Sequence, residues 1–305
     1  MKGTFLAATM ALGIVGAACA NSSSVTGAHD GNGGGGGITH PTAPDQLVIR
    51  ISTGGGFIAP SYSITQLPQF SLMGDGRAVT PGAIPEIYPG PAISPLFSQQ
   101  LTPDAVQAIL ALAKADGLFV SSRDYTDMGS VGIADAGTTT ITIVADGQTH
   151  TFNFYALTDL GQNKPDHMSQ AEFEARTKAQ DFATQVGDLR WLPAGSAADQ
   201  VPFAPTGVRV FVSGYQSDPN MTEPPVEWPL GTGLADFGDS MKGAAAGSGL
   251  NTNDGLPSRC GVVTGDDLTT LMPLIQRANQ LSPWKSDGKQ YGLLFRPLLP
   301  DESGC

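Results

Sequence analysis

Two cysteines far apart in the chain, Cys260 and Cys305, have the side chains best suited to covalent chemistry. In an oxidising compartment an isolated pair of cysteines most simply forms a disulfide. The alternative is a redox-active pair, which usually needs a Cys-x-x-Cys spacing or surroundings that activate a thiol, and the sequence shows neither. We therefore predict a Cys260–Cys305 disulfide, which would stabilise the fold by about 4 kcal/mol on the chain-entropy model.

A third cysteine, Cys19, follows a targeting segment. Lys2 precedes an apolar stretch at 5–15 and small residues at 16–18, which is the order of a secretory signal, and the stretch is too short for a comfortable membrane span. The run at 15–19 is similar to a bacterial lipobox, in which Cys19 would carry the lipid, whereas the Ala-Cys-Ala run at 18–20 would allow simple secretion. Residues 22–37 are rich in serine and glycine, as in a flexible tether. We predict lipidation of Cys19, with secretion as the alternative.

The sharpest catalytic candidate is Ser240, in the Gly-Asp-Ser-Met run at 238–241, which resembles the nucleophile block of GDSL-type hydrolases. In those enzymes the block lies near the start of the domain, whereas here it lies late, in a glycine-rich region. No histidine follows Ser240, so a base would have to come from His150 or His167. We predict no catalytic residue and no enzyme, and an envelope hydrolase that uses Ser240 is the alternative.

Signals for metal binding are weak. No His-x-x-x-His or Cys-x-x-Cys spacing occurs, which argues against zinc. Residues 251–255 echo the start of a calcium loop, and Asp124, Asp127 and Asp135 lie near one another in a second loop. Turn chemistry explains both sets of residues. We predict no metal and no cofactor.

Net charge argues against one large class of partners. The chain has 28 Asp or Glu and 16 Lys or Arg, a formal charge of −12. Such a surface repels phosphate backbones, so we expect no nucleic-acid binding. The acidic residues are spread along the chain, and we assign them no partner.

Hydrophobic periodicity and helix-start signals predict the elements that would position these residues. One helix is expected between the N-cap candidate Thr102 and Gly117, and a second at 170–189, where Ser169 and Glu172 form a capping box. A third is expected after Thr264, broken or kinked by Pro273. Strands are expected at 46–52, 70–73, 138–145, 148–156, 207–213, 284–286 and 290–296, with a short edge strand at 227–230.

These elements predict an α+β fold, a mostly antiparallel sheet or sheets with two or three covering helices. Strand, capped helix and Asp-Gly hairpin occur twice, from Leu47 to Ala156 and from Val208 to Leu299, so two similar halves packed as one body are a hypothesis, with chance recurrence as the alternative. The predicted organisation is signal and lipobox (1–20), tether (21–44), first half (45–160), linking helix (161–205) and second half closed by the disulfide (206–305).

Several runs of residues resemble uncharacterised secreted lipoproteins of actinobacteria. They are the leader with Cys19, Trp-Pro-Leu at 228–230, Cys-Gly-Val-Val-Thr-Gly at 260–265, Ala-Asn-Gln at 278–280 with Trp284, and Arg-Pro-Leu-Leu-Pro-Asp-Glu at 296–302 before Cys305. The resemblance implies a lipid-anchored envelope protein with a paired Cys260 and Cys305. It implies no activity and no catalytic residue.

The function predicted from these observations is that of a lipid-anchored, extracytoplasmic binding or structural protein of the bacterial cell envelope. Its partners would be the membrane, through the lipid on Cys19, and an envelope protein. Besides the hydrolase, the alternative is a protease-inhibitor-like module, in which the proline-rich loop at 81–95 would insert into a partner.

Overall fold

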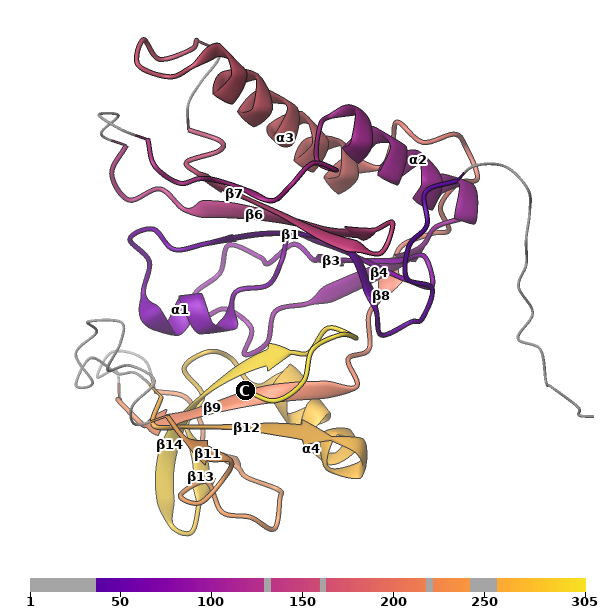
Figure 1. Ribbon diagram of the computed structural model, residues 1–305. Helices are drawn as coiled ribbons and strands as arrows, with labels where there is room; N and C mark the ends of the chain where they lie inside the picture. Colours follow the sequence, from indigo (N-terminus) through magenta and orange to yellow (C-terminus); the bar gives the residue numbers. More distant parts are fainter. Residues whose placement is uncertain (1–36, 129–132, 160–162, 218–221, 242–256) are drawn as a thin grey trace, which may run out of the picture. The chain divides into compact units, whose positions relative to one another are not determined.

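The computed structural model describes residues 37–128, 133–159, 163–217, 222–241 and 257–305. It is an α+β structure with two mostly antiparallel sheets, which confirms the predicted fold class (Figure 1). The first sheet has the strand order β5-β7-β6-β1-β2-β3-β4-β8. These strands are β1 (Leu47–Gly54), β2 (Phe70–Met73), β3 (Arg77–Pro81), β4 (Leu96–Gln100), β5 (Arg123–Tyr125), β6 (Thr138–Ala145), β7 (Gln148–Tyr155) and β8 (Val201–Pro202).

The second sheet is built from the later part of the chain, in the order β10-β13-β14-β9-β12-β11. Its strands are β9 (Gly207–Gly214), β10 (Val226–Glu227), β11 (Asp239–Ser240), β12 (Arg259–Thr264), β13 (Trp284–Ser286) and β14 (Lys289–Pro297). The helices are α1 (Pro60–Thr65), α2 (Pro103–Ala115), α3 (Gln170–Asp188) and α4 (Gly265–Arg277). In both sheets one short edge strand pairs in parallel, β5 with β7 and β10 with β13.

The first sheet has one apolar face, which α2 and α3 cover (Figure 1). On β6 the residues Ile141, Ile143 and Ala145 alternate with half-buried ones, and Ile49 and Ile51 of β1 lie opposite the two isoleucines. This period of two is what a half-covered strand requires. The helix α3, expected between two halves of the chain, contributes Ala179, Phe182 and Val186 to this same core.

Both predicted helix caps are present. The Thr102 Oγ1 atom accepts a hydrogen bond from the Ala105 N–H at 3.2 Å, and the Ser169 Oγ atom accepts one from the Glu172 N–H at 3.1 Å. The capping box is incomplete, because the Glu172 carboxylate binds Arg176 instead of turning back to the cap. Arg176 is only 2% exposed and also donates to the carbonyls of Tyr155 and Tyr125.

Both Asp-Gly pairs turn hairpins as predicted. Asp146 and Gly147 have φ of 49° and 71°, and Asp287 and Gly288 have φ of 52° and 74°. Positive φ at both central residues matches the right-handed twist of the flanking strands. The turns therefore set the registers of β6 with β7 and of β13 with β14.

The second sheet packs against α4 through a separate core. Trp228 and Trp284 lie in it with their rings 6.1 Å apart and nearly perpendicular, and Phe295 packs edge-on against Trp284. Helix α4 runs through Pro273 as one element, so the helix is not broken into two pieces there, and the alternative expectation of a kink stays a prediction. The sequence reading also missed β3 and β4, which flank the proline-rich loop at 82–95.

Besides α1, which contacts β14, two segments join the sheets. From the proline-rich loop, Ala92 and Ile93 pack against the second core. The other is residues 298–305, called the bridging segment below, from which Leu299 packs with Val79 of β3 and Leu96 of β4 in a small apolar cluster. The two sheets also differ in topology, because the first hairpin meets β1 through its first strand, β6, and the second meets β9 through its second strand, β14.

Candidate ligand-binding cleft

The structure contains the predicted disulfide between Cys260 on β12 and Cys305 in the bridging segment, with their Cα atoms 6.1 Å apart. Cys260 is buried, and Cys305 is exposed. Arg209 of β9 holds the same segment by donating to the Gly304 carbonyl at 2.6 Å. Cys19 and its expected lipidation lie outside the described residues.

Charge pairs fix the bridging segment against both sheets. Arg50 of β1 donates to Asp301 at 2.7 Å, and Arg296 of β14 binds both carboxylate oxygens of Glu302, at 2.5 and 2.8 Å. Burial would raise the pKa of Glu302, but the hydrogen bonds and charge of Arg296, the Leu299 N–H and the charge of Arg209 together hold that pKa below its usual value. Burial, followed by repulsion from Arg296, lowers the pKa of Arg209.

Ser240, the catalytic candidate, lies on the edge strand β11, opposite Arg259 of β12. The glycine of its motif has a packing role: Gly238 has φ of 62°, and a Cβ atom there would lie 2.0 Å from the Cys260 carbonyl oxygen. Arg259 donates to the carbonyls of Phe237 and Gly238, which holds this strand edge in place. Close backbone packing is thus sufficient to explain a glycine before Asp239.

The two histidines considered as bases belong to the other sheet region. His150 is 5% exposed on the core face of β7, stacks on Phe119 and hydrogen-bonds through Nδ1 to the Val120 carbonyl at 2.8 Å. His167 is exposed just before α3. The structure therefore places Ser240 in the second sheet and both histidines in the region of the first.

Of the carboxylates considered for calcium, Asp124 has a local partner. Asp124 accepts hydrogen bonds from the hydroxyl and the N–H of Thr126, and these lower its pKa. This is the Asx-turn pattern. Among the described residues, no group of three or more His, Cys, Asp or Glu side chains is arranged to hold a metal ion. Residues 251–255 lie outside the described part.

A cleft of about 460 Å³, called the interlayer cleft here, lies where the first sheet, α1 and the bridging segment meet. This volume falls within the range of small-molecule sites. The cleft is lined by Arg50, Ser52, Thr53, Gly54, Ser63, Gln66, Leu67, Pro68, Thr138, Thr140, Arg296 and Glu302. It therefore draws residues from both sheets, and Arg296 also donates to the Gln66 carbonyl at 3.1 Å.

The floor of the interlayer cleft is the polar face of the first sheet. Arg50 lies opposite Thr142, Ser52 opposite Thr140 and Gly54 opposite Thr138. These positions alternate with the buried isoleucines, so their side chains share the face that α2 and α3 leave uncovered. Ser52, Thr138, Thr140 and Thr142 therefore place a row of hydroxyl groups on this face.

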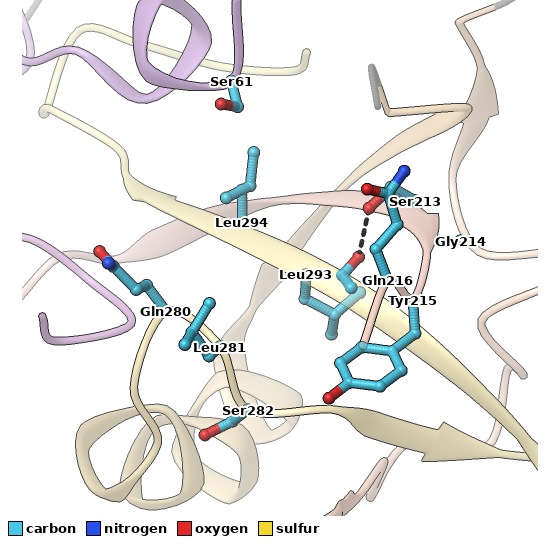
Figure 2. Close-up of a pocket in the computed structure, with 11 residues that line it drawn as sticks. Ser61, Ser213, Gly214, Tyr215, Gln216, Gln280, Leu281, Ser282, Leu293 and Leu294 are labelled. Atoms are coloured by element: carbon cyan, nitrogen blue, oxygen red, sulfur yellow. Dashed lines mark hydrogen bonds between the residues drawn. The ribbon is translucent and has the colours of Figure 1, made fainter. Parts of the chain in front are cut away.

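A second, smaller pocket of about 180 Å³ is lined by Ser61 of α1 and by residues of β9, β14 and the segment after α4. Figure 2 shows Ser61 of α1 above Leu294 of β14, with Gln280, Leu281, Ser282 and Tyr215 around the opening. The Ser213 hydroxyl donates to the Gly292 carbonyl at 3.0 Å, which ties β9 to β14 at its base (Figure 2). The described residues that line this pocket carry no charge.

Comparisons of the chain with protein-family models, with curated proteins and with solved structures found no match. In the part of the chain that the structure describes, no helix has the length and apolar character needed to cross a membrane.

Sequence reasoning missed the interlayer cleft. One signal was present: the Thr-x-Thr-x-Thr pattern at 138–142 puts three hydroxyls on one strand face. Nothing in the sequence indicated that Arg296 and Glu302, which lie at least 154 positions after Thr142, would border that face.

Proposed function

We propose that this protein is a lipid-anchored module on the extracytoplasmic face of a bacterial cell membrane and that it binds a ligand in the interlayer cleft. The leader, Cys19 and the Ser/Gly-rich tether support the anchor, together with the resemblance to actinobacterial lipoproteins. The Cys260–Cys305 disulfide fits an oxidising compartment.

One observation carries the binding role: an open cleft of about 460 Å³ lined by polar groups from four parts of the chain. Charge pairs hold its walls, since Arg50 binds Asp301 and Arg296 binds Glu302. A site whose polar groups are fixed in advance loses less conformational entropy when a ligand binds. The cleft is therefore suited to recognition.

The anchor and the cleft can be tested separately. Intact mass of the protein from its own membranes should show a diacylglycerol on Cys19, and Cys19→Ala should release the protein from the membrane fraction. A start at Asn21 in the native protein would contradict the anchor.

For the cleft, the melting temperature of the purified protein is measured with and without an extract of the cell envelope, because a ligand stabilises the state that binds it. Thr140→Phe fills the floor and should abolish the rise in melting temperature, whereas Thr149→Phe, exposed near the other end of the hairpin, is the control. Ser63→Phe on α1 repeats the test if Thr140→Phe fails to fold. An equal rise in all variants would refute binding in the cleft.

The proline-rich loop supports a second candidate, a protease-inhibitor-like module. Gln280 donates its N–H to the Gly90 carbonyl at 2.9 Å, which anchors the loop, while Ile84, Ile87 and Tyr88 are exposed. Apolar side chains on an anchored loop suit insertion into a protease pocket. Elastase-like and chymotrypsin-like proteases should then be inhibited, and rapid cleavage within 82–95 without inhibition would contradict this candidate.

A further inference from the structure

We propose that the ligand of the interlayer cleft is a neutral, polyhydroxylated chain, an oligosaccharide; this inference rests on the proposed binding function. Three features of the cleft point to this chemistry: a hydroxyl-bearing floor, charges that are already paired, and exposed aromatic rings on the wall segment.

The floor presents hydroxyl groups at regular intervals. Ser52, Thr138 and Thr140 line the cleft, and the Thr140 hydroxyl donates to the Asn153 Oδ1 atom at 2.9 Å. A hydroxyl has one hydrogen to donate and two lone pairs, so the Thr140 oxygen can still accept. Sugar hydroxyls likewise donate and accept hydrogen bonds, so successive sugar hydroxyls can pair with successive hydroxyls of this floor.

The charges in the cleft are compensated before any ligand arrives. Arg50 pairs with Asp301, whose side chain is 17% exposed, and Arg296 pairs with Glu302, whose side chain is 13% exposed. A charged ligand would have to displace one member of a well-formed pair, which leaves the other member unpaired and costs binding energy. A neutral ligand can hydrogen-bond to the pairs without breaking them.

Aromatic rings lie on the segment that forms one wall. This segment runs from Gly54 to Leu67 and contributes Ser63 and Gln66 to the cleft. It also carries Phe57, 89% exposed, and Tyr62, 61% exposed. Neither ring lines the cleft itself, but both belong to this wall segment, and they offer apolar faces on which the C–H surface of a sugar ring can pack outside the cleft.

The polar face continues beyond the cleft, which favours a chain over a single sugar. Thr142 of β6 and Thr151 and Asn153 of β7 are half-buried on the same side of the sheet as Thr140. Alternate residues along a strand are about 6.8 Å apart, and neighbouring strands about 4.8 Å. A linear oligosaccharide could therefore meet successive polar side chains as it leaves the cleft across β6 and β7.

The test is calorimetric titration of the purified protein with linear neutral hexasaccharides of glucose, mannose, arabinose and N-acetylglucosamine, and with hexagalacturonate as a charged chain of equal length. At least one neutral hexasaccharide should bind more tightly than hexagalacturonate. Thr140→Val, which removes a hydroxyl at nearly constant shape, and Tyr62→Ala should each weaken that binding about fivefold, the loss expected for one hydrogen bond or ring contact.

Thr149→Val is the matched control, because Thr149 is exposed on β7 and does not line the cleft, and its affinity should equal that of the unmodified protein. Absence of binding by all neutral hexasaccharides at millimolar concentration, or tighter binding of hexagalacturonate, would overturn the inference. If envelope extract still stabilises the protein in a Thr140-dependent way while no hexasaccharide binds, the binding function stands and the carbohydrate assignment fails.

Discussion

Replacement of Cys305 by serine removes the disulfide with little other disturbance. Cys305 is exposed, so a serine hydroxyl there remains in water, whereas the same change at Cys260 would bury a polar group in β12. The variant therefore measures what the covalent link contributes.

The size of the effect follows from the length of the loop that the disulfide closes. Cys260 and Cys305 are 45 positions apart. On the chain-entropy model, opening a loop of this length returns about 13 cal/mol/K to the unfolded chain, or about 4 kcal/mol at 25 °C. A typical domain has about 5–15 kcal/mol of stability, so the loss is large.

Urea unfolding, followed by tryptophan fluorescence, provides the assay, since Trp228 and Trp284 lie in the core of the second sheet. Cys305→Ser should lower the transition midpoint, and the unmodified protein in excess reductant should unfold like the variant. Ser303→Ala, next to the disulfide in the same exposed segment, is the control and should match the unmodified protein. A loss of less than about 1 kcal/mol would refute the loop-entropy argument.

Three further predictions concern stability. Arg176→Met should cost about 3 kcal/mol in urea unfolding, because two backbone carbonyls and the Glu172 carboxylate lose a buried donor, and exposed Lys178→Met should cost little. Gly238→Ala should cost about 2 kcal/mol or more by the same assay, since its φ is positive and its Cβ would meet a carbonyl oxygen, whereas Gly231→Ala, with open space around it, should be near neutral. Glu302 has a lowered pKa in the folded protein, so its contribution to stability is fully present above the unfolded-state pKa of about 4.3 and is lost as pH falls through the folded-state pKa. The melting temperature of Glu302→Gln should therefore depend less on pH in that acid range than the melting temperature of the unmodified protein. An unchanged pH dependence would contradict the pairing with Arg296.

The parts of the fold that could be predicted are those set by neighbours in sequence. Thr102 and Ser169 cap helices through atoms three residues away, and each Asp-Gly pair closes a hairpin by its own backbone preference. The alternation along 138–145 likewise predicts the covered face of β6 from that strand alone.

The parts that could not be predicted depend on partners far along the chain. Arg176 is buried because two carbonyls from other strands need its donors, although a charged residue on a helix usually lies in water. β3 and β4 are short and bound a loop with many prolines, so only pairing with each other and with β2 and β8 defines them. The interlayer cleft exists only where residues of β1, α1, β6 and β14 meet.

The bridging segment also has a consequence for the order of synthesis. Arg50 and Asp301, whose pairing ties the first sheet to this segment, are 251 positions apart. Residues 298–305 leave the ribosome after every strand of both sheets has been made. A chain interrupted at residue 297 would therefore contain the strands of both sheets but would lack Glu302, the residue of the bridging segment that lines the cleft. Only a chain translated through residue 302 can form the Arg296–Glu302 pair, so the contacts that hold the cleft also report that synthesis has passed this point.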